Sequence, residues 1–210
     1  MVPRIIHQFW VGPPMPAVYR EFAAGWRRLH PGWYYRLWSE ADLPPLRNQA
    51  LYDDAAHLCP GFEGQLRADV LRYELLHRFG GVWVDMDFEP RKPLDALLEG
   101  VSCFAAWERQ DRIVNNAIMG AEAWHPFIAS LVEALPASVR SGKSKRPSVV
   151  SGPQFLTAQY RLHPEGVTVF DEALFYPYRC DELHRSEDEF PEAYAVHHWA
   201  NQRRLWRKPL

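Results

Sequence analysis

The stretch at residues 63–90 constrains the fold of this 210-residue chain more than any other. Apolar residues at residues 65–79 recur at helical spacing, and a Gly-Gly pair follows, which is favoured at the end of a helix. Residues 82–88 then alternate as a strand does, so Asp85 and Asp87 are predicted to share one face. A helix followed by a strand that ends on two carboxylates is typical of an α/β fold with a ligand site at the strand end.

The predicted helix carries charges on both of its sides. One face carries charges that we expect to lie in solvent: Glu63, Arg67, Glu74 and Arg78. Asp69 and Arg72 lie one turn apart on the apolar side. A charge there must be paired or must meet a ligand, because burial of a lone charge is costly. These two residues are therefore either an intrahelical ion pair or part of a site.

The two carboxylates at the strand end indicate a divalent cation. Asp85 and Asp87 repel each other unless a cation lies between them, and oxygen ligands suit Mg²⁺ or Mn²⁺. Such a cation typically neutralises the phosphate oxygens of a substrate. An Asp-x-Asp triplet alone is weak evidence, and here its position after a helix, two glycines and an apolar strand strengthens it.

The rest of the chain alternates helical and extended patterns, which favours one α/β domain over residues 1–210. Residues 4–11 predict a first strand with Trp10 at its C-terminal edge, where ligands bind in open α/β sheets. The polar residues 137–148 predict a basic surface loop, or a lid that closes over a ligand. A net charge of -2 argues against a protein built as a whole for nucleic acid.

Cysteine usage and hydropathy predict a cytoplasmic protein. Cys59, Cys103 and Cys180 lie far apart and show no metal-ligand spacing, as expected of a reduced protein. We expect neither a transmembrane segment nor a signal peptide. The basic tail at 201–210 would allow a peripheral contact with an anionic membrane surface.

Several blocks of the chain resemble, in order, the DXD-containing sugar-transferase family. This family includes yeast-type initiating mannosyltransferases, bacterial capsular polysaccharide enzymes and glucosylating clostridial toxins. The main block is ADVLRYELLHRFGGVWVDMD at residues 68–87. The other blocks are PRIIHQFW at 3–10, HPGWYYRLW at 30–38, NNAIMGA at 115–121, HPF at 125–127, SGPQFLT at 151–157 and HHW at 197–199.

The resemblance implies a GT-A fold, which is a mixed sheet flanked by helices. It also implies a metal-dependent transfer of a hexose from a nucleotide-diphosphate sugar, with UDP-hexose favoured over GDP-mannose and with retention at the anomeric carbon. Trp10 matches the aromatic residue that stacks on the nucleobase. Asp69 and Arg72 match the pair that contacts the sugar and the phosphates of the donor, so both are predicted donor-binding and catalytic residues.

The remaining predicted site residues belong to the metal and the acceptor. Asp85 matches the carboxylate that reaches the ribose, the donor sugar and often the metal, and Asp87 matches the direct ligand of Mn²⁺ or Mg²⁺. Asn116 matches a polar residue near donor and acceptor. His197 or His198 matches a late residue that reaches the metal or the diphosphate. Asp85 and Asn116 are thus predicted to be catalytic.

The resemblance leaves the acceptor open among glycans, lipid-linked sugars, proteins, small molecules and nucleic acids. The family often closes with His-x-Trp and a nearby Ser-Trp pair, whereas residues 201–205 here precede Trp206. Two alternatives to the transferase are a non-catalytic module that binds nucleotide sugars or glycans, and a Mg²⁺-dependent phosphatase of the haloacid dehalogenase type. The second expects its Asp-x-Asp near the start of its core, and here the motif lies at mid-chain.

Overall fold

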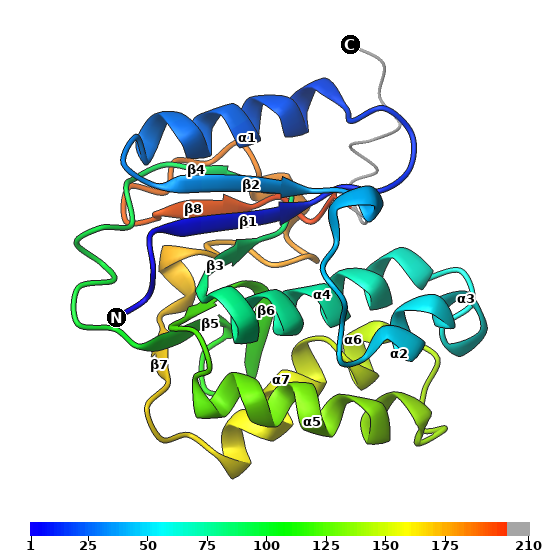
Figure 1. The fold of residues 1–210 in the computed structure, drawn as a ribbon. Helices are drawn as coiled ribbons and strands as arrows, with labels where there is room; N and C mark the ends of the chain where they lie inside the picture. The colour runs from blue at the N-terminus through cyan, green and yellow to red at the C-terminus, as the bar shows by residue number, and fades with distance from the viewer. Residues whose placement is uncertain (201–210) are drawn as a thin grey trace.

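A six-stranded mixed sheet organises the chain in the computed structural model, which describes residues 1–200 (Figure 1). Its strands are β1 (Ile5–Phe9), β2 (Tyr34–Trp38), β3 (Gly81–Val84), β5 (Cys103–Arg109), β6 (Ile113–Ala121) and β7 (Thr168–Phe170). They lie in the order β2-β1-β3-β6-β5-β7, and β6 runs antiparallel to both of its neighbours. The strands β4 (Phe88–Pro90) and β8 (Ala195–His197) form a second, antiparallel sheet. The predicted mixed α/β sheet is confirmed.

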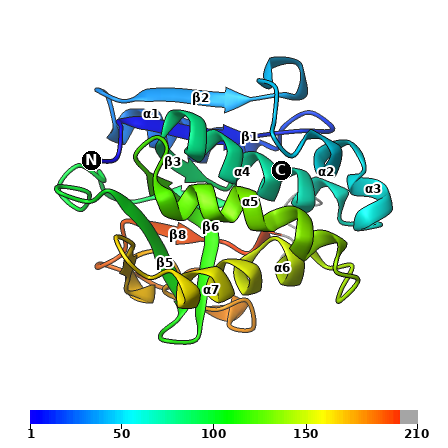
Figure 2. The same ribbon diagram turned by 60° about the horizontal axis from the view of Figure 1, so that its bottom comes forward.

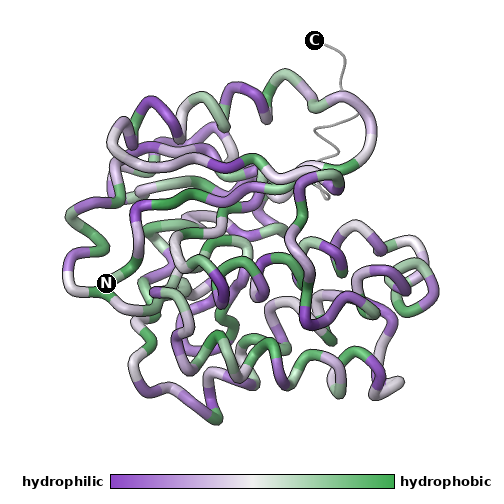
Figure 3. Tube along the Cα trace, viewed as in Figure 1, coloured by the Kyte–Doolittle hydropathy of each residue, from purple (hydrophilic) through white to green (hydrophobic). Residues whose placement is uncertain are grey.

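Helices cover both faces of the large sheet. They are α1 (Ala17–Leu29), α2 (Gln49–Asp53), α3 (Ala55–Leu58), α4 (Glu63–Phe79), α5 (Pro126–Arg140), α6 (Pro147–Val150) and α7 (Pro153–Leu162). Figures 1 and 2 show α4, α5 and α7 together on one side of the sheet and α1 on the other. Polar and apolar residues alternate along α1, as expected of a helix that covers a sheet on one side only (Figure 3).

The alternation of side chains along β3 directs them into two of the three apolar cores of the described chain. Trp83 faces the core that β3 shares with α4, α5 and α7. Val82 and Val84 face the opposite core, which contains Trp26 of α1 and Phe88 of β4. The segment after β3 therefore lies at the boundary of both cores, where the two predicted carboxylates follow.

The helix α4 lies at the centre of the fold and is buried along most of its length. Gly80 ends it with φ of 64°, and its N–H donates to the carbonyl of Leu76 at 2.9 Å. A Cβ atom at Gly80 would lie 2.6 Å from the backbone nitrogen of Ala123, so only glycine fits this close approach. The predicted helix thus exists, and it begins two residues earlier than the sequence pattern indicates.

One of the four charges expected in solvent on α4 is buried instead. The carboxylate of Glu74 accepts hydrogen bonds from the backbone N–H groups of Arg47 (3.1 Å) and Asn48 (2.8 Å), which precede α2. Helical spacing does not reveal this contact, because the covering segment lies 26 and 27 residues away. The prediction of solvent exposure was therefore wrong for Glu74, whereas Arg78 is exposed.

The strand predicted over residues 82–88 is broken in two. β3 ends at Val84, and residues 85–87 form a turn in which the N–H of Phe88 donates to the carbonyl of Asp85 at 3.2 Å. The turn moves the chain from the large sheet to β8. Asp85 and Asp87 still reach one site, through this turn rather than through the alternation of a single strand.

The polar segment 137–148 is only partly a loop. α5 extends to Arg140 and α6 begins at Pro147, which leaves residues 141–146 as the connection. Within the described part of the chain, no helix combines the length and the apolar character that a membrane span requires. The basic tail with Trp206 lies outside the described residues.

Candidate active site

A cavity of about 640 Å³ opens where β1 and β3 end. This volume is in the range of 300–1,000 Å³ that is typical of ligand sites. The residues predicted from the sequence that line it are Trp10, Asp69, Arg72, Asp85, Asp87, Asn116 and His197. Further lining residues include Tyr19, Trp83, Asn115 and Trp199, for which no role was predicted, and Arg146, which belongs to the predicted basic loop or lid.

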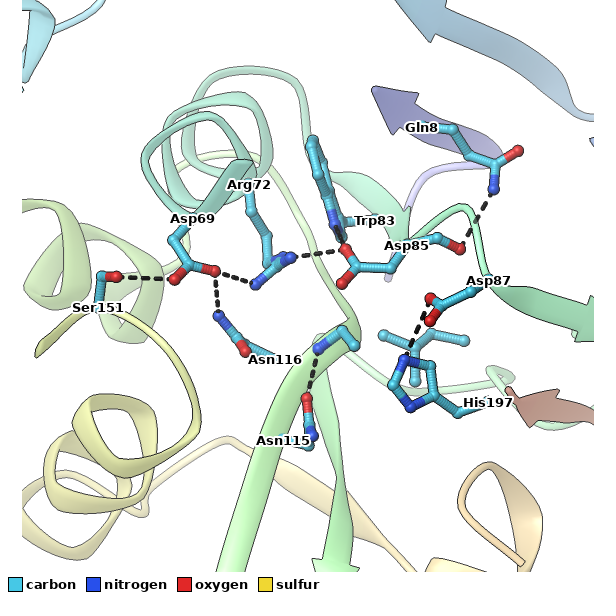
Figure 4. A network of polar contacts seen from close by, with 12 residues as sticks. Gln8, Asp69, Arg72, Trp83, Asp85, Asp87, Asn115, Asn116, Ser151 and His197 are labelled. Carbon is cyan, nitrogen blue, oxygen red and sulfur yellow. Dashed lines mark hydrogen bonds and ion pairs between the residues drawn. The ribbon is translucent and has the colours of Figure 1, made fainter. Parts of the chain in front are cut away.

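The guanidinium group of Arg72 joins the helix α4 to the turn after β3 (Figure 4). Its Nη1 lies 2.6 Å from Oδ1 of Asp69, and its Nη2 lies 2.6 Å from Oδ1 of Asp85. Burial lowers the pKa of Arg72, but the two carboxylates outweigh it and raise the pKa above its usual value. The indole N–H of Trp83 donates to the same Oδ1 of Asp85 at 2.7 Å, so the second oxygen of Asp85 stays open to a ligand.

Asp69 is the most fully bonded carboxylate of the cavity. Its Oδ1 accepts from Arg72 and from Nδ2 of Asn116 (2.8 Å), and its Oδ2 accepts from Oγ of Ser151 (2.7 Å). Burial raises the pKa of Asp69, and the charge of Arg72 together with the hydrogen bonds from Ser151 and Asn116 opposes this rise. Asp69 and Arg72 thus form the intrahelical ion pair and also line the cavity, and their contact with a ligand stays a prediction. We call Asp69, Arg72, Asn116 and Ser151 the α4 half of the site.

The opposite wall is formed by the strand β8 and the residues after it. Nε2 of His197 lies 3.1 Å from Oδ1 of Asp87, and the N–H of Ala200 donates to Oδ2 of Asp87 at 2.9 Å. Burial raises the pKa of Asp87, but His197 and backbone N–H groups outweigh it and lower the pKa to about 2. Burial lowers the pKa of His197, and Asp87 reverses this and raises the pKa. We call Asp87 and His197 the β8 half of the site.

The residues between the two halves fit a divalent cation. Asp85, Asp87 and His197 each offer one ligand atom, and these atoms lie within 4.8 Å of one another. Within residues 1–200, Nδ1 of His197 is buried and has no hydrogen-bond partner. Two carboxylates and one imidazole form a donor set that suits Mn²⁺ or Mg²⁺ with additional oxygen ligands.

The two adjacent histidines differ in their surroundings. The ring of His198 lies outside the carboxylate cluster, with Nε2 at 2.9 Å from Oε2 of Glu89 and Nδ1 at 3.1 Å from the hydroxyl of Tyr178. The structure thus brings the ring of His197, and not that of His198, to the carboxylate of Asp87. The role of either histidine as a metal ligand stays a prediction.

Two further lining residues are held by contacts within the chain. The indole N–H of Trp10 donates to the carbonyl of Pro13 at 2.8 Å, and its ring stays partly exposed at the cavity wall. Its stacking on a base stays a prediction. The amide oxygen of Asn115 accepts from the N–H of Ala117 at 2.8 Å (Figure 4), and its nitrogen donates to Glu108 at 2.7 Å. The repeated Asn in NNAIMGA was the available signal for Asn115, but the sequence does not show that both amides reach the cavity.

The fold and the DXD motif at this cavity resemble those of GT-A glycosyltransferases. The family model described as "Glycosyltransferase sugar-binding region containing DXD motif" matches residues 16–104. The chain is 28% identical to inositol phosphoceramide mannosyltransferase 3 of Schizosaccharomyces pombe over 227 aligned residues, which cover 95% of this chain and 60% of that protein. The chain spans about half the length of the curated relatives it matches.

Solved structures show the same fold. The PaToxG glycosyltransferase superimposes with a TM-score of 0.61 at 13% identity, over 78% of this chain and 70% of that chain. The UDP-bound glycosyltransferase domain of the YGT toxin superimposes with a TM-score of 0.53 at 10% identity, over 80% of this chain and 79% of that chain. The predicted GT-A fold is confirmed by these comparisons.

Proposed function

We propose that this chain transfers a hexose from a nucleotide-diphosphate sugar to the hydroxyl group of an acceptor. This proposal rests on the cluster of Asp85, Asp87 and His197 inside a cavity of about 640 Å³, next to the buried guanidinium of Arg72. A divalent cation held by the cluster would neutralise the charge that develops on the departing nucleoside diphosphate. The protein supplies the oriented carboxylates and the surrounding donors.

The charges of the cavity support an anionic donor. Arg72 is paired with two carboxylates, so its charge is largely neutralised by the protein. Arg146 reaches the cavity from the connection before α6, and no carboxylate of the described chain lies within ion-pair distance of it. Arg146 therefore stays available for the phosphate groups of a bound donor.

The donor can be proposed more specifically than the acceptor. A UDP-linked hexose is favoured because the YGT toxin domain with this fold was solved with UDP bound, and GDP-mannose is the alternative because three relatives are named mannosyltransferases. The acceptor is left as a hydroxyl-bearing glycan, lipid-linked sugar, protein or small molecule. A cytoplasmic location and a role in polysaccharide synthesis stay predictions from the sequence.

We also propose that the transfer retains the anomeric configuration. Asp69, Asp85 and Asp87 are the carboxylates that line the cavity, and each accepts hydrogen bonds from protein donors. The three carboxylates are thus engaged by protein groups, and the retention that the family resemblance implies would then proceed by attack of the acceptor from the side of the leaving group. NMR of the first product would overturn the proposal by showing an inverted anomer.

The function is tested by a thermal-shift screen of nucleotide sugars with and without Mn²⁺, followed by hydrolysis of each donor that binds. A donor that binds the native state raises the melting temperature by mass action. We expect stabilisation that requires metal, together with slow release of free hexose. Metal-dependent binding without any turnover, with or without candidate acceptors, would instead show a non-catalytic binding module. The phosphatase alternative is set aside because the residues that carry Asp85 and Asp87 match the family model of DXD glycosyltransferases.

A further inference from the structure

The block SGPQFLT at residues 151–157 resembles its family counterpart, but the resemblance gives it no role. Its first residue, Ser151, is fully buried between α6 and α7. The hydroxyl of Ser151 lies 2.7 Å from Oδ2 of Asp69 and 3.2 Å from the carbonyl oxygen of Pro147. A hydroxyl group has one proton to donate, and the shorter contact is to the carboxylate, so the proton of Ser151 belongs to Asp69.

A closed ring of hydrogen bonds surrounds this contact. Nδ2 of Asn116 donates to Asp69 at 2.8 Å and lies 3.1 Å from the hydroxyl of Tyr73. The hydroxyl of Tyr73 in turn donates to the carbonyl oxygen of Ser151 at 2.7 Å. The ring joins α4, β6 and the α6–α7 junction, so each member is oriented by the others.

The ring determines which part of Asp69 stays open. A carboxylate offers about four lone-pair positions. Arg72 and Asn116 occupy two positions on Oδ1, and Ser151 occupies one on Oδ2. One lone-pair position on Oδ2 therefore remains for a hydrogen-bond donor of a ligand in the cavity that Asp69 lines.

The second residue of the block allows Ser151 to approach Asp69. A Cβ atom at Gly152 would lie 3.1 Å from Cα of Ser148, 3.2 Å from the carbonyl oxygen of Pro147 and 3.4 Å from Oδ2 of Asp69. A larger residue would push the junction away from Asp69. Pro153 then opens α7, where its missing N–H is not needed.

We propose that Ser151 is a positioning residue, which orients Asp69 so that the remaining lone pair of Oδ2 accepts a hydrogen bond from a hydroxyl of the donor hexose. This inference rests on the proposed function and concerns the sugar end of the donor only. Loss of the Ser151 hydroxyl would rotate or loosen Asp69 and leave the nucleotide end of the cavity intact.

The test compares Ser151→Ala with a matched control, Ser138→Ala. The hydroxyl of Ser138 donates to the carbonyl of Val150 at 2.7 Å, so the control loses a hydrogen bond to the same segment without touching Asp69. Donor hydrolysis with Mn²⁺ and binding of UDP by calorimetry are measured for both. For Ser151→Ala we expect kcat to fall about 10- to 100-fold, as for small misplacements of a catalytic group. The affinity of Ser151→Ala for UDP should stay within about threefold of the original. The kcat of the control Ser138→Ala should also stay within about threefold, and Ser151→Thr should regain part of the lost turnover.

An unchanged kcat in Ser151→Ala, an equal loss in Ser138→Ala, or a parallel loss of UDP affinity would overturn the inference. If Ser151→Ala does not fold, Tyr73→Phe takes its place, because it removes the hydrogen bond to the Ser151 carbonyl and leaves those to Asp69. Its kcat should then fall less than about tenfold but measurably. If the unmodified protein shows no turnover, the proposed function is contradicted instead. Ser151 is then tested by binding alone: Ser151→Ala should weaken the affinity for a UDP-hexose and leave the affinity for UDP unchanged.

Discussion

The two halves of the site are built in opposite ways. In the α4 half, the carboxylate of Asp69 accepts hydrogen bonds from three side chains. In the β8 half, Asp87 and His197 belong to a two-stranded sheet and its preceding turn, and their ligand atoms lie within 4.8 Å of one of Asp85. The difference teaches that the α4 half is held by contacts between protein groups, whereas the β8 half brings together atoms that suit a cation.

The largest effect is expected in the β8 half. Asp87→Ala removes the carboxylate that His197 and the Ala200 N–H hold, and with it a ligand of the proposed cation. Metal-dependent donor hydrolysis should fall at least about 10³-fold, the scale of losing a charge-stabilising group. Circular dichroism should show the fold retained. Donor hydrolysis at the original rate in Asp87→Ala would contradict the proposed cation site, and with it the contrast between the two halves.

The next effect separates the halves by what they bind. Asp69→Asn keeps the shape of the side chain and removes its charge, so Arg72 loses one of its two ion pairs. We expect kcat for donor hydrolysis to fall about 10- to 100-fold because the sugar is misplaced. Calorimetry should find UDP affinity, measured with Mn²⁺, within about threefold of the original. A loss of UDP affinity as large as the loss of kcat would assign the α4 half to the nucleotide instead.

The adjacent histidines give a smaller and sharper contrast. His197→Asn should weaken Mn²⁺ binding at least about tenfold, whereas His198→Asn should leave it near the original value, because the ring of His198 contacts Glu89 and Tyr178. Titration of Mn²⁺ followed by electron paramagnetic resonance measures both. Equal losses in the two variants would show that the β8 half extends beyond Asp87 and His197.

The wall formed by Trp10 lies apart from both halves and tests the nucleotide end. Trp10→Ala should weaken UDP binding by about 1–3 kcal/mol if the ring stacks on the base, a scale taken from stacking on nucleic-acid bases. Trp124→Ala is the matched control, because Trp124 is exposed and does not line the cavity. Unchanged UDP affinity in Trp10→Ala would make this tryptophan a packing residue next to Tyr19.

The smallest effect is a dependence of stability on pH without metal. The pKa of His197 is raised above its ordinary 6.5, so its pairing with Asp87 stabilises the fold below that pH and is lost as pH rises through the raised value. Asp87, with a pKa of about 2, stays charged throughout this range. The melting temperature of the original protein minus that of His197→Gln should therefore be larger at about pH 5.5 than at about pH 8.5. A difference that grows with pH would contradict the pairing.

Local patterns predicted the α4 half better than the β8 half. Helical spacing placed Asp69 and Arg72 on the buried side of α4, because both belong to one regular element. It did not predict that Glu74 is buried, since the covering N–H groups come from a distant segment. Ser151 went without a role for the same reason, as it lies 82 residues from Asp69.

Local patterns also could not choose between His197 and His198. His197 ends the strand β8 and His198 follows it directly, and their different surroundings depend on Glu89 and Tyr178, which contact the ring nitrogens of His198. The alternation predicted over residues 82–88 correctly placed Asp85 and Asp87 at one site, but they do not lie on one continuous strand. Pairing of β4 with β8, rather than local propensity, ends β3 at Val84 and starts a turn.

The contact between Asp87 and the backbone of Ala200 joins parts of the chain that lie 113 residues apart. A ribosome must therefore deliver residue 200 before the carboxylate–imidazole cluster can close. Proteolytic removal of the segment after Pro191 would take His197 and the N–H of Ala200 away from Asp87, and would thus open the cluster.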